Sequence, residues 1–387
     1  MKQPLHLCFV APAIWPILSG DTTIEFAGGS EVHQAFLARA LLQSGFRVSV
    51  ITDVGCEPEE FEHDGFRIVR IIRKGKVIPV IRNIHPRLTN IWDAMWRSKA
   101  DIYFQSNTGA VTLACALFSA VYRRRFVYLG ASDIDFDRDQ LWKAFPGRGG
   151  WRERQMYQLG LRLADRIVAQ HMGQVAACRR SFEREPVPIA NPYVAPPGAT
   201  RAKDGKVLWV ATVKSLKRPD LILELARSLP ELQFRIVGGP APGDEAAVFE
   251  RTKQAASALR NVEFVGFVPF AEIDSHFDAA RIFVNTSDYE GFPSTFLQSW
   301  ARGIPTVSFF DCGAKAIDGR PVGLVCEDFD AMKRAVLHLA TDDEDWAQQG
   351  RRAREYCDQN HSFRPVASKY SGLINELAPN GEFDRCP

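Results

Sequence analysis

The feature that most constrains this chain is a regular alternation of short apolar, β-rich runs with segments of helical periodicity. Such alternation is typical of βα units that build parallel sheets. In the first unit, an apolar run at 5–10 predicts a strand, apolar residues spaced from Val32 to Leu41 predict a helix, and 48–52 predicts the next strand. Further strands are predicted at 102–104, 126–129 and 167–169.

A proline-rich segment separates two such series. The stretch from Glu185 to Lys206 contains five prolines and has no helical period, so its middle is predicted to be a linker. A helix is predicted to begin at Pro219, a residue suited to a first helical turn. Strands of the second series are predicted at 207–211, 234–237, 262–265, 282–285, 306–309 and 323–325. A chain of 387 residues also exceeds what one core usually organises.

Composition excludes several classes of function. Lys plus Arg (48) nearly balances Asp plus Glu (46), so no global charge indicates nucleic-acid binding. The eight cysteines form no C-x-x-C pair, which argues against a zinc site or disulfide framework and favours a reducing cytoplasm. The apolar run at 5–10 is too short for a signal peptide, and the run at 110–122 is too short to cross a bilayer. We therefore expect a soluble, cytoplasmic protein.

The most informative segment runs from Ser287 to Pro305. After the predicted strand, a turn is expected to lead into a helix that begins near Ser294 or Thr295, whose free N–H groups would attract an anion. Glu290 lies in that turn, at the sheet edge where open α/β folds bind ligands. Gln298 follows on the helix. The alternative is an ordinary helix cap beside a solvated glutamate.

This segment resembles the Glu-x7-Glu region of retaining group 1 glycosyltransferases with the GT-B fold (glycosyltransferase family 4). The matching residues are Glu290, Gly291, Phe292, Pro293, Leu297, Ala301, Gly303 and Pro305. The resemblance implies that Glu290 contacts the donor sugar, with Gly291, Phe292, Ser294 and Thr295 also in the donor site. The family's second glutamate, which binds the ribose, is replaced by Gln298, which keeps hydrogen bonding but loses the charge.

A second segment, 210–220, resembles the family's strand-loop-helix that neutralises the donor diphosphate with an arginine and a lysine. Lys217 falls on the family lysine, which the resemblance makes catalytic together with Glu290. Thr212 occupies the arginine position, and Lys214 can supply the missing charge. The alternative is a solvated basic turn.

Three weaker resemblances concern the rest of the donor site and the acceptor side. Gly28 and Gly29 resemble the family's G-G-x-E loop, Gly239 its I-V-G-x-G turn, and Phe267 the segment that faces the nucleobase. The histidine that many relatives carry after the strand at 126–129 is absent. Ser132 and Asp133 lie there instead and are weak candidates for the acceptor site. We expect His33 and His171 to be structural, and no metal site.

Together these resemblances imply an α/β GT-B fold, with two Rossmann-like domains facing each other across a cleft. Residues 1–190 would form the acceptor-side domain, 191–205 the linker and 206–362 the nucleotide-sugar donor domain. A helix at 363–378 would pack back on the N-terminal domain, before a tail at 379–387.

The implied activity is metal-independent transfer of a hexosyl group, with retention, from a nucleoside-diphosphate sugar to a glycan or lipid-linked acceptor in polysaccharide or envelope synthesis. The donor is a co-substrate, and no other cofactor is expected. A non-catalytic binding or partner protein, favoured by Gln298 and Thr212, is the alternative. A sugar-nucleotide epimerase ranks third, because its acid and base groups cannot be placed.

Two basic clusters remain. Arg123–Arg125 and the stretch 148–166, with Trp151, Tyr157 and Leu161 interleaved, would suit a lipid-linked acceptor or peripheral contact at the inner face of a membrane. An ordinary amphipathic surface helix is the alternative.

Overall fold

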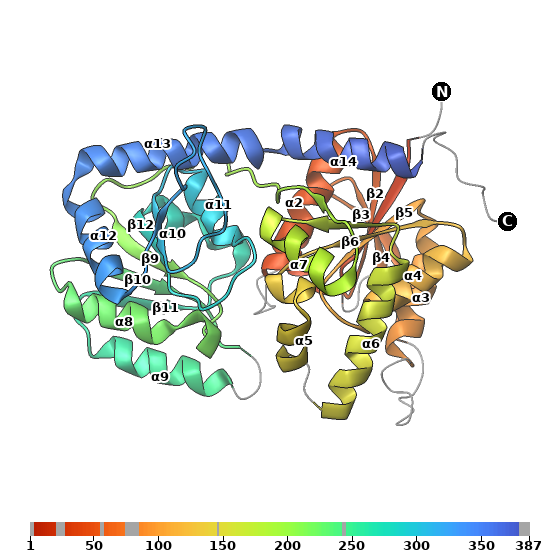
Figure 1. Ribbon diagram of the computed structural model, residues 1–387, viewed down its shortest axis with the longest axis horizontal. Helices are drawn as coiled ribbons and strands as arrows, with labels where there is room; N and C mark the ends of the chain where they lie inside the picture. The colour runs from red at the N-terminus through yellow and green to blue at the C-terminus, as the bar shows by residue number, and fades with distance from the viewer. Residues whose placement is uncertain are drawn as a thin grey trace. The chain divides into compact units, whose positions relative to one another are not determined.

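The chain divides into two compact units (Figure 1). The computed structural model describes residues 4–20, 28–54, 58–73, 85–144, 147–241 and 245–378. Unit 1 comprises Met1–Ser19, Gly28–Pro192 and Phe363–Pro387, and unit 2 comprises Gly20–Ala27 and Tyr193–Ser362. No helix or strand lies between Pro188 and Lys206, the region of the expected linker. The predicted domain limits themselves stay predictions.

Unit 1 is built on a sheet with the strand order β3-β4-β2-β1-β5-β6-β7-β8, parallel except for β3. The strands are β1 (His6–Val10), β2 (Arg47–Thr52), β3 (Glu60–His63), β4 (Phe66–Arg70), β5 (Ile102–Ser106), β6 (Arg125–Leu129), β7 (Arg166–Ala169) and β8 (Val187–Pro188). Its helices are α1 (Trp15–Ser19), α2 (Gly29–Gln43), α3 (Arg87–Ser98), α4 (Ala110–Val121), α5 (Arg138–Ala144), α6 (Gly147–Leu163), α7 (Met172–Phe182) and α14 (Phe363–Leu377), with a 3₁₀ turn, η2 (Asp133–Phe136).

Alternating strand residues bury the two faces of this sheet under different helices. Cys8 and Val10 of β1 share a core with α3, α4, α6 and α7. Phe104 lies on the other face, where its ring is 6.3 Å from that of Tyr370 in α14. Phe363, also in α14, lies 6.0 Å from Phe36 of α2. Two helices far apart in sequence therefore complete one layer of unit 1.

Unit 2 contains a fully parallel sheet with the order β11-β10-β9-β12-β13-β14. The strands are β9 (Lys206–Val210), β10 (Phe234–Val237), β11 (Val262–Gly266), β12 (Ala280–Asn285), β13 (Thr306–Ser308) and β14 (Leu324–Val325). The helices are α8 (Pro219–Ser228), α9 (Ala246–Ser257), α10 (Asp274–Asp278), α11 (Ser294–Trp300), α12 (Phe329–Thr341) and α13 (Asp343–Asn360), with 3₁₀ turns η3 (Ser215–Lys217) and η5 (Phe270–Glu272). One core joins α8 and α12 to β9, β10 and β12.

Every strand predicted from the sequence is present within one or two residues, and α8 begins at Pro219 as expected. The β3–β4 hairpin was not predicted, because its first strand, Glu-Phe-Glu-His, is too polar to read as buried. Its two-residue turn carries a usable signal: Asp64 and Gly65 both have positive φ, 49° and 81°. An Asp-Gly pair is a preferred turn for such hairpins.

Candidate functional site

The C-terminal ends of two neighbouring strands bring the charged candidates of unit 2 to one edge of its sheet. Strand β9 lies between β10 and β12. The chain continues from β9 to β10 on one side, and it later crosses from β11 to β12 on the other side. Ligands of open α/β sheets bind at such a switch point. Thr212, Lys214 and Lys217 follow β9, and Glu290 follows β12.

Lys217 and Glu290 form an ion pair at this edge. The Lys217 Nζ lies 2.5 Å from Glu290 Oε1, and their side chains are only 16% and 14% exposed. Ser287 Oγ donates to the same oxygen at 2.7 Å, and Asn285 Nδ2 donates to it at 3.2 Å. Oε2 accepts no hydrogen bond from the described residues. One carboxylate oxygen is therefore held firmly while the other stays available.

Short local bonds hold the loop that carries Glu290. Asn285, the last residue of β12, accepts a hydrogen bond from Ser287 N through Oδ1 at 2.8 Å, a turn that asparagine commonly stabilises. Thr286 Oγ1 donates to the carbonyl of Lys217 at 2.8 Å and accepts from Trp209 Nε1 at 2.9 Å. These bonds tie the loop after β12 to the loop after β9.

The loop after β9 is shaped by its backbone and contributes a second cation. Arg218 has a φ of 49° between η3 and α8 and bonds to Asp220 and Asp288. Burial lowers the pKa of Lys214, as does the neighbouring cation of Lys217, while Glu290 and Glu245 raise it. Two ammonium groups thus lie at this edge together with the carboxylates of Glu290 and Glu245.

Two glycines allow the loop after β10 to pack closely against the segments that follow β9 and β11. A Cβ at Gly238 would lie 1.8 Å from the carbonyl oxygen of Ala211, and one at Gly239 would lie 3.0 Å from the ring of Phe267. Gly239 O accepts from Val213 N at 2.9 Å. Larger residues at these glycines would push apart the loops that surround the candidate site.

The predicted site residues in and before helix α11 differ in how far their side chains are exposed. Pro293 is its N-cap, and no side chain caps it, so the alternative of a serine or threonine cap is wrong. The ring of Phe292 is buried, 4.8 Å from that of His361, so only its backbone can serve a ligand. Gln298 is 4% exposed. Gly291 is buried, while Ser294 and Thr295 are partly exposed.

In unit 1, the candidate residues belong to local networks of their own. Gly28 is the N-cap of α2, which begins at Gly29, and Glu31 accepts from Asn107 Nδ2 at 3.1 Å. Ser132 Oγ caps η2 by accepting from Ile134 N. Asp133 Oδ1 lies 2.9 Å from His171 Nε2, so both weak acceptor-side candidates already have structural partners.

His33 is buried, which lowers its pKa to about 4 and leaves it neutral. Across the described residues, no group of three or more His, Cys, Asp or Glu is placed to hold a metal ion. Within the same part of the chain, no helix combines the length and apolar character needed to cross a membrane.

Sequence reasoning missed three residues that organise the site: Asn285, Ser287 and Glu245. Glu245 accepts from both the N–H and the hydroxyl of Ser215, at 2.8 and 2.9 Å, and these bonds lower its pKa. Ser287 could have been predicted from the sequence, because it precedes Glu290 by three residues in the same turn. Glu245 was not, because only the folded chain brings it to Ser215.

Comparison with known proteins bears on this site. Residues 196–356 match the family model of glycosyl transferases group 1. An uncharacterized glycosyltransferase of Haemophilus influenzae is 25% identical over 369 residues, covering 91% of this chain and 97% of the relative. The O-antigen chain mannosyltransferase B of Escherichia coli is 26% identical over 189 residues, covering 46% of this chain and 47% of that protein.

Solved structures resemble the whole chain. Sucrose-phosphate synthase from Thermosynechococcus elongatus has a TM-score of 0.73 at 17% identity and covers 96% of this chain and 99% of its own. The Anabaena protein HepE in complex with UDP and glucose has a TM-score of 0.70 at 15% identity, with coverages of 95% and 99%. The GT-B fold is thus confirmed. Together with the family match, these findings support the group 1 glycosyltransferase superfamily.

Proposed function

With a glycosyltransferase of the group 1 superfamily as the premise, we propose that this chain transfers a hexosyl group from a nucleoside-diphosphate sugar to a glycan acceptor with retention. The observation that carries the proposal is the Lys217–Glu290 pair, held at the switch point between β9 and β12. The family resemblance implies a cation for the donor diphosphate and a carboxylate for the donor sugar, and this pair supplies one of each.

In this proposal, Lys217 and Lys214 neutralise the donor diphosphate. Burial lowers the pKa of Lys214, and repulsion from the ammonium group of Lys217 lowers it further. A diphosphate entering between them would offset that repulsion and replace Glu290 as the partner of Lys217. Cations placed where charge develops on a leaving group stabilise the transition state without reorganising during the reaction.

Glu290 would then bind the donor sugar. Ser287 and Asn285 hold Oε1, so Oε2 can accept a hydrogen bond from a sugar hydroxyl without rotation of the carboxylate. We propose that the amide of Gln298 binds the ribose, that Gly239 and Phe267 adjoin the base, and that the backbone at Gly291, Phe292, Ser294 and Thr295 adjoins the diphosphate. The ribose role of Gln298 and the base role of Phe267 are those that the family resemblance implies.

Retention would follow from front-face displacement. The bond between the anomeric carbon and the phosphate oxygen breaks, the acceptor oxygen bonds to that carbon from the same face, and the acceptor proton passes to the leaving phosphate. This route needs neither a protein nucleophile nor a metal ion, and the chain's cations would carry the electrostatic work. Gly28, Gly29 and Thr212 are proposed as further donor contacts, and Ser132 and Asp133 as acceptor contacts.

The relatives suggest the class of substrate. HepE is described with UDP and glucose, and a structurally similar TarM variant with UDP, Fondaparinux and α-GlcNAc-glycerol. A UDP-hexose donor and a glycan acceptor are therefore the first to test. A role in polysaccharide or envelope synthesis, a cytoplasmic location and a lipid-linked acceptor belong to the same proposal.

The test is donor turnover by the full chain. We expect one nucleoside-diphosphate hexose to raise the melting temperature, because a ligand that binds only the folded state stabilises it. We also expect glycan-dependent release of the nucleoside diphosphate, with retained configuration in the NMR spectrum of the product. Lys253, exposed on α9, offers the matched control: Lys253→Ala should behave as wild type while Lys217→Ala loses turnover.

A non-catalytic donor-binding protein is the second candidate, favoured by Gln298 and Thr212 where the family carries charged residues. Stabilisation by a donor without release of its diphosphate, with every acceptor tried, would favour that candidate over transfer. An inverted product would contradict the proposed mechanism.

A further inference from the structure

The exposed large apolar side chains of unit 1 are concentrated on three adjacent helices. Six of the seven large hydrophobic residues exposed in its described part lie on α3, α4 and α6. They are Trp96, Leu117, Val121, Trp151, Leu159 and Leu163, exposed by 41% to 63%. Helix α4 packs against both α3 and α6, so the three helices cover one side of the sheet (Figure 1).

The structure also corrects the interpretation of α6. Tyr157 and Leu161, which the sequence placed in a basic, surface-facing stretch, are fully buried in the core that α6 shares with α4 and η2. Leu159 and Leu163 are the exposed residues, at 46% and 44%. Helix α6 therefore has one buried, apolar face, but it also carries apolar residues on its exposed face.

This helical layer is strongly basic. Helices α3, α4 and α6 contain six arginines and two acidic residues, a formal charge of +4 in a chain whose total is +2. Of these arginines, Arg154 is buried and Arg97 also pairs with Glu60 of β3, so neither adds free positive charge to the surface. Both acidic residues are engaged: Asp93 with Arg97 at 3.1 Å and Glu153 with the N–H of Ala110 at 2.7 Å. Among the described residues, exposed Lys99 and Arg123 form no ion pair.

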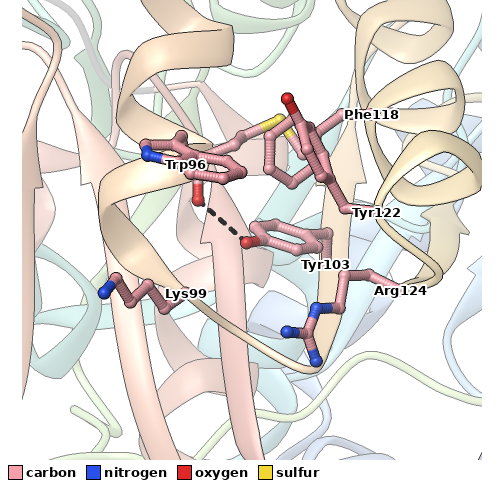
Figure 2. A pocket seen from close by; sticks show the side chains of 7 residues that line it. Trp96, Lys99, Tyr103, Phe118, Tyr122 and Arg124 are labelled. Atoms are coloured by element: carbon pink, nitrogen blue, oxygen red, sulfur yellow. Dashed lines mark hydrogen bonds between the residues drawn. The ribbon is translucent and has the colours of Figure 1, made fainter. Parts of the chain in front are cut away.

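A shallow pocket, open to solvent, lies where α3 and α4 end. In Figure 2, Trp96 and Tyr122 lie on one side of it, and Lys99 and Arg124 lie on the other. The rings of Trp96 and Tyr122 are 4.9 Å apart. Aromatic rings with adjacent cations are typical of protein surfaces at the level of lipid headgroups.

We propose that the α3/α4/α6 face of unit 1 docks on the surface of an anionic lipid bilayer. Val121, Leu117 and Trp96 would enter the headgroup region, and Lys99 and Arg123 would contact anionic headgroups. Charge complementarity selects this occupant: the exposed, unpaired cations Lys99 and Arg123 beside exposed leucine and valine suit an anionic, apolar interface. A carbohydrate would use the aromatic rings but not the aliphatic side chains.

The proposal does not depend on donor binding, because this face lies away from the strand ends of unit 1 that carry its donor candidates. Helix α2 follows the C-terminal end of β1, whereas Lys99 and Arg124 precede β5 and β6. They therefore lie at the opposite edge of the unit 1 sheet from Gly28 and Gly29. Failure of vesicle binding would leave the proposed function intact. Absence of donor turnover would likewise leave the proposed membrane docking intact.

The test is co-sedimentation of the full chain with vesicles of phosphatidylglycerol mixed with phosphatidylcholine, and with vesicles of phosphatidylcholine alone. We expect binding to the anionic vesicles only, decreasing as salt is added. Since each basic residue near such a surface contributes about a fivefold factor, Lys99→Glu with Arg123→Glu should weaken binding at least about 25-fold. Leu117→Ser with Val121→Ser should weaken binding to the same vesicles in low salt.

The matched control is Arg334→Glu with Leu337→Ser, which changes an exposed cation and an exposed leucine on α12 of unit 2. It should bind vesicles as wild type does, and melting curves should show that all variants fold. Equal binding by the control and the face variants would overturn the proposal. So would absence of binding to anionic vesicles, competition by free glycerol phosphate, or self-association through this face without lipid.

Discussion

Two carboxylates, Glu290 in unit 2 and Asp135 in unit 1, follow a sheet strand at comparable positions, and their surroundings differ. Asp135 accepts hydrogen bonds from Thr108 Oγ1 at 2.6 Å and from the N–H groups of Ala131 and Ser132 at 2.7 and 3.0 Å. Both its oxygens are engaged, and it is 3% exposed. Glu290 meets a cation and two side-chain donors at one oxygen only.

The difference separates a structural carboxylate from one suited to a ligand. Backbone N–H groups cannot leave Asp135, so its network is complete within the fold. The partner of Glu290 is a lysine on another loop, which a stronger anion can recruit. Burial raises the pKa of Asp135 above its ordinary value, because the hydrogen bonds that it accepts compensate only in part for the loss of water.

Removal of the ligand-binding carboxylate should have the largest effect. Glu290→Ala should lower glycosyl transfer by at least about 100-fold, the scale for losing one preorganised polar contact in a transition state. The fold should persist, because Glu290 is outside the hydrophobic core. Donor-dependent kinetics and a melting curve measure both, with Glu250→Gln on the exposed side of α9 as the control. Unchanged turnover would remove Glu290 from the proposed site.

Lys217→Ala should cost about 2–4 kcal/mol of transition-state stabilisation, because a largely buried cation acts in weak solvent screening. Lys214→Ala should cost less, unless Lys214 has replaced the cation missing at Thr212. Kinetics of both single variants and the double variant separate these cases. If Lys217→Ala keeps full activity while Lys214→Ala is inactive, the cation that binds the diphosphate is Lys214 and not Lys217. Two silent variants in an active enzyme would contradict the donor site.

Asp135→Asn should instead act on stability. An amide has only one acceptor oxygen, so in either orientation its nitrogen replaces an oxygen that accepts from the two backbone N–H groups or from Thr108 Oγ1. We expect this change to cost about 1–3 kcal/mol of the free energy of unfolding. Donor affinity should not change, which a titration of the variant checks. Asp139→Asn, at an exposed position in α5, is the control for denaturation. A loss of turnover without a loss of stability would make Asp135 a functional residue.

The difference in unfolding free energy between wild type and Asp135→Asn should also depend on pH. Because the folded pKa of Asp135 is raised, its contribution to stability is fully present below the unfolded pKa and falls as pH rises through the folded pKa. The asparagine side chain of the Asp135→Asn variant has no such titration. The gap in unfolding free energy between wild type and Asp135→Asn should therefore be largest in acid and narrow toward neutral pH.

Ser287→Ala tests whether the position of the Glu290 carboxylate matters. We expect a loss of about 1–2 kcal/mol in kcat/KM, less than the loss of Glu290 itself, because Lys217 and Asn285 still bond to Oε1. The decrease should appear mainly in kcat, since the diphosphate contacts remain. Ser287→Thr keeps the hydroxyl and should restore part of the rate. If Ser287→Ala and Ser287→Thr are equally impaired, the hydroxyl is not the cause.

The smallest effect is expected at Gln298. Gln298→Glu should keep or improve donor affinity, by up to about tenfold, because a carboxylate makes stronger hydrogen bonds to ribose hydroxyls. Calorimetric titration with the donor measures the change. A collapse of affinity, with the variant still folded, would mean that the ribose is held elsewhere and that the alignment of α11 is wrong.

Much of unit 2 was predictable because its signals are local. Short apolar runs between turns predicted all six strands, and Pro219 marked the start of α8. Spacing to the family motif also selected Glu290 and Lys217 before their separation was known. The β3–β4 hairpin of unit 1 escaped because an edge strand need not be apolar, and the polar sequence of β3 lacks the pattern of a buried strand.

The sequence by itself determined where most of the strands lie, how the chain divides into two α/β series, and which residues resemble a donor site. Only the tertiary structure decided that Lys217 pairs with Glu290, 73 residues away, and that Leu159 and Leu163 of α6 face outward while Tyr157 and Leu161 are buried. The physical reason is that periodicity and turn chemistry act over a few residues. Pairing and exposure instead depend on which strands become neighbours and which helix covers them.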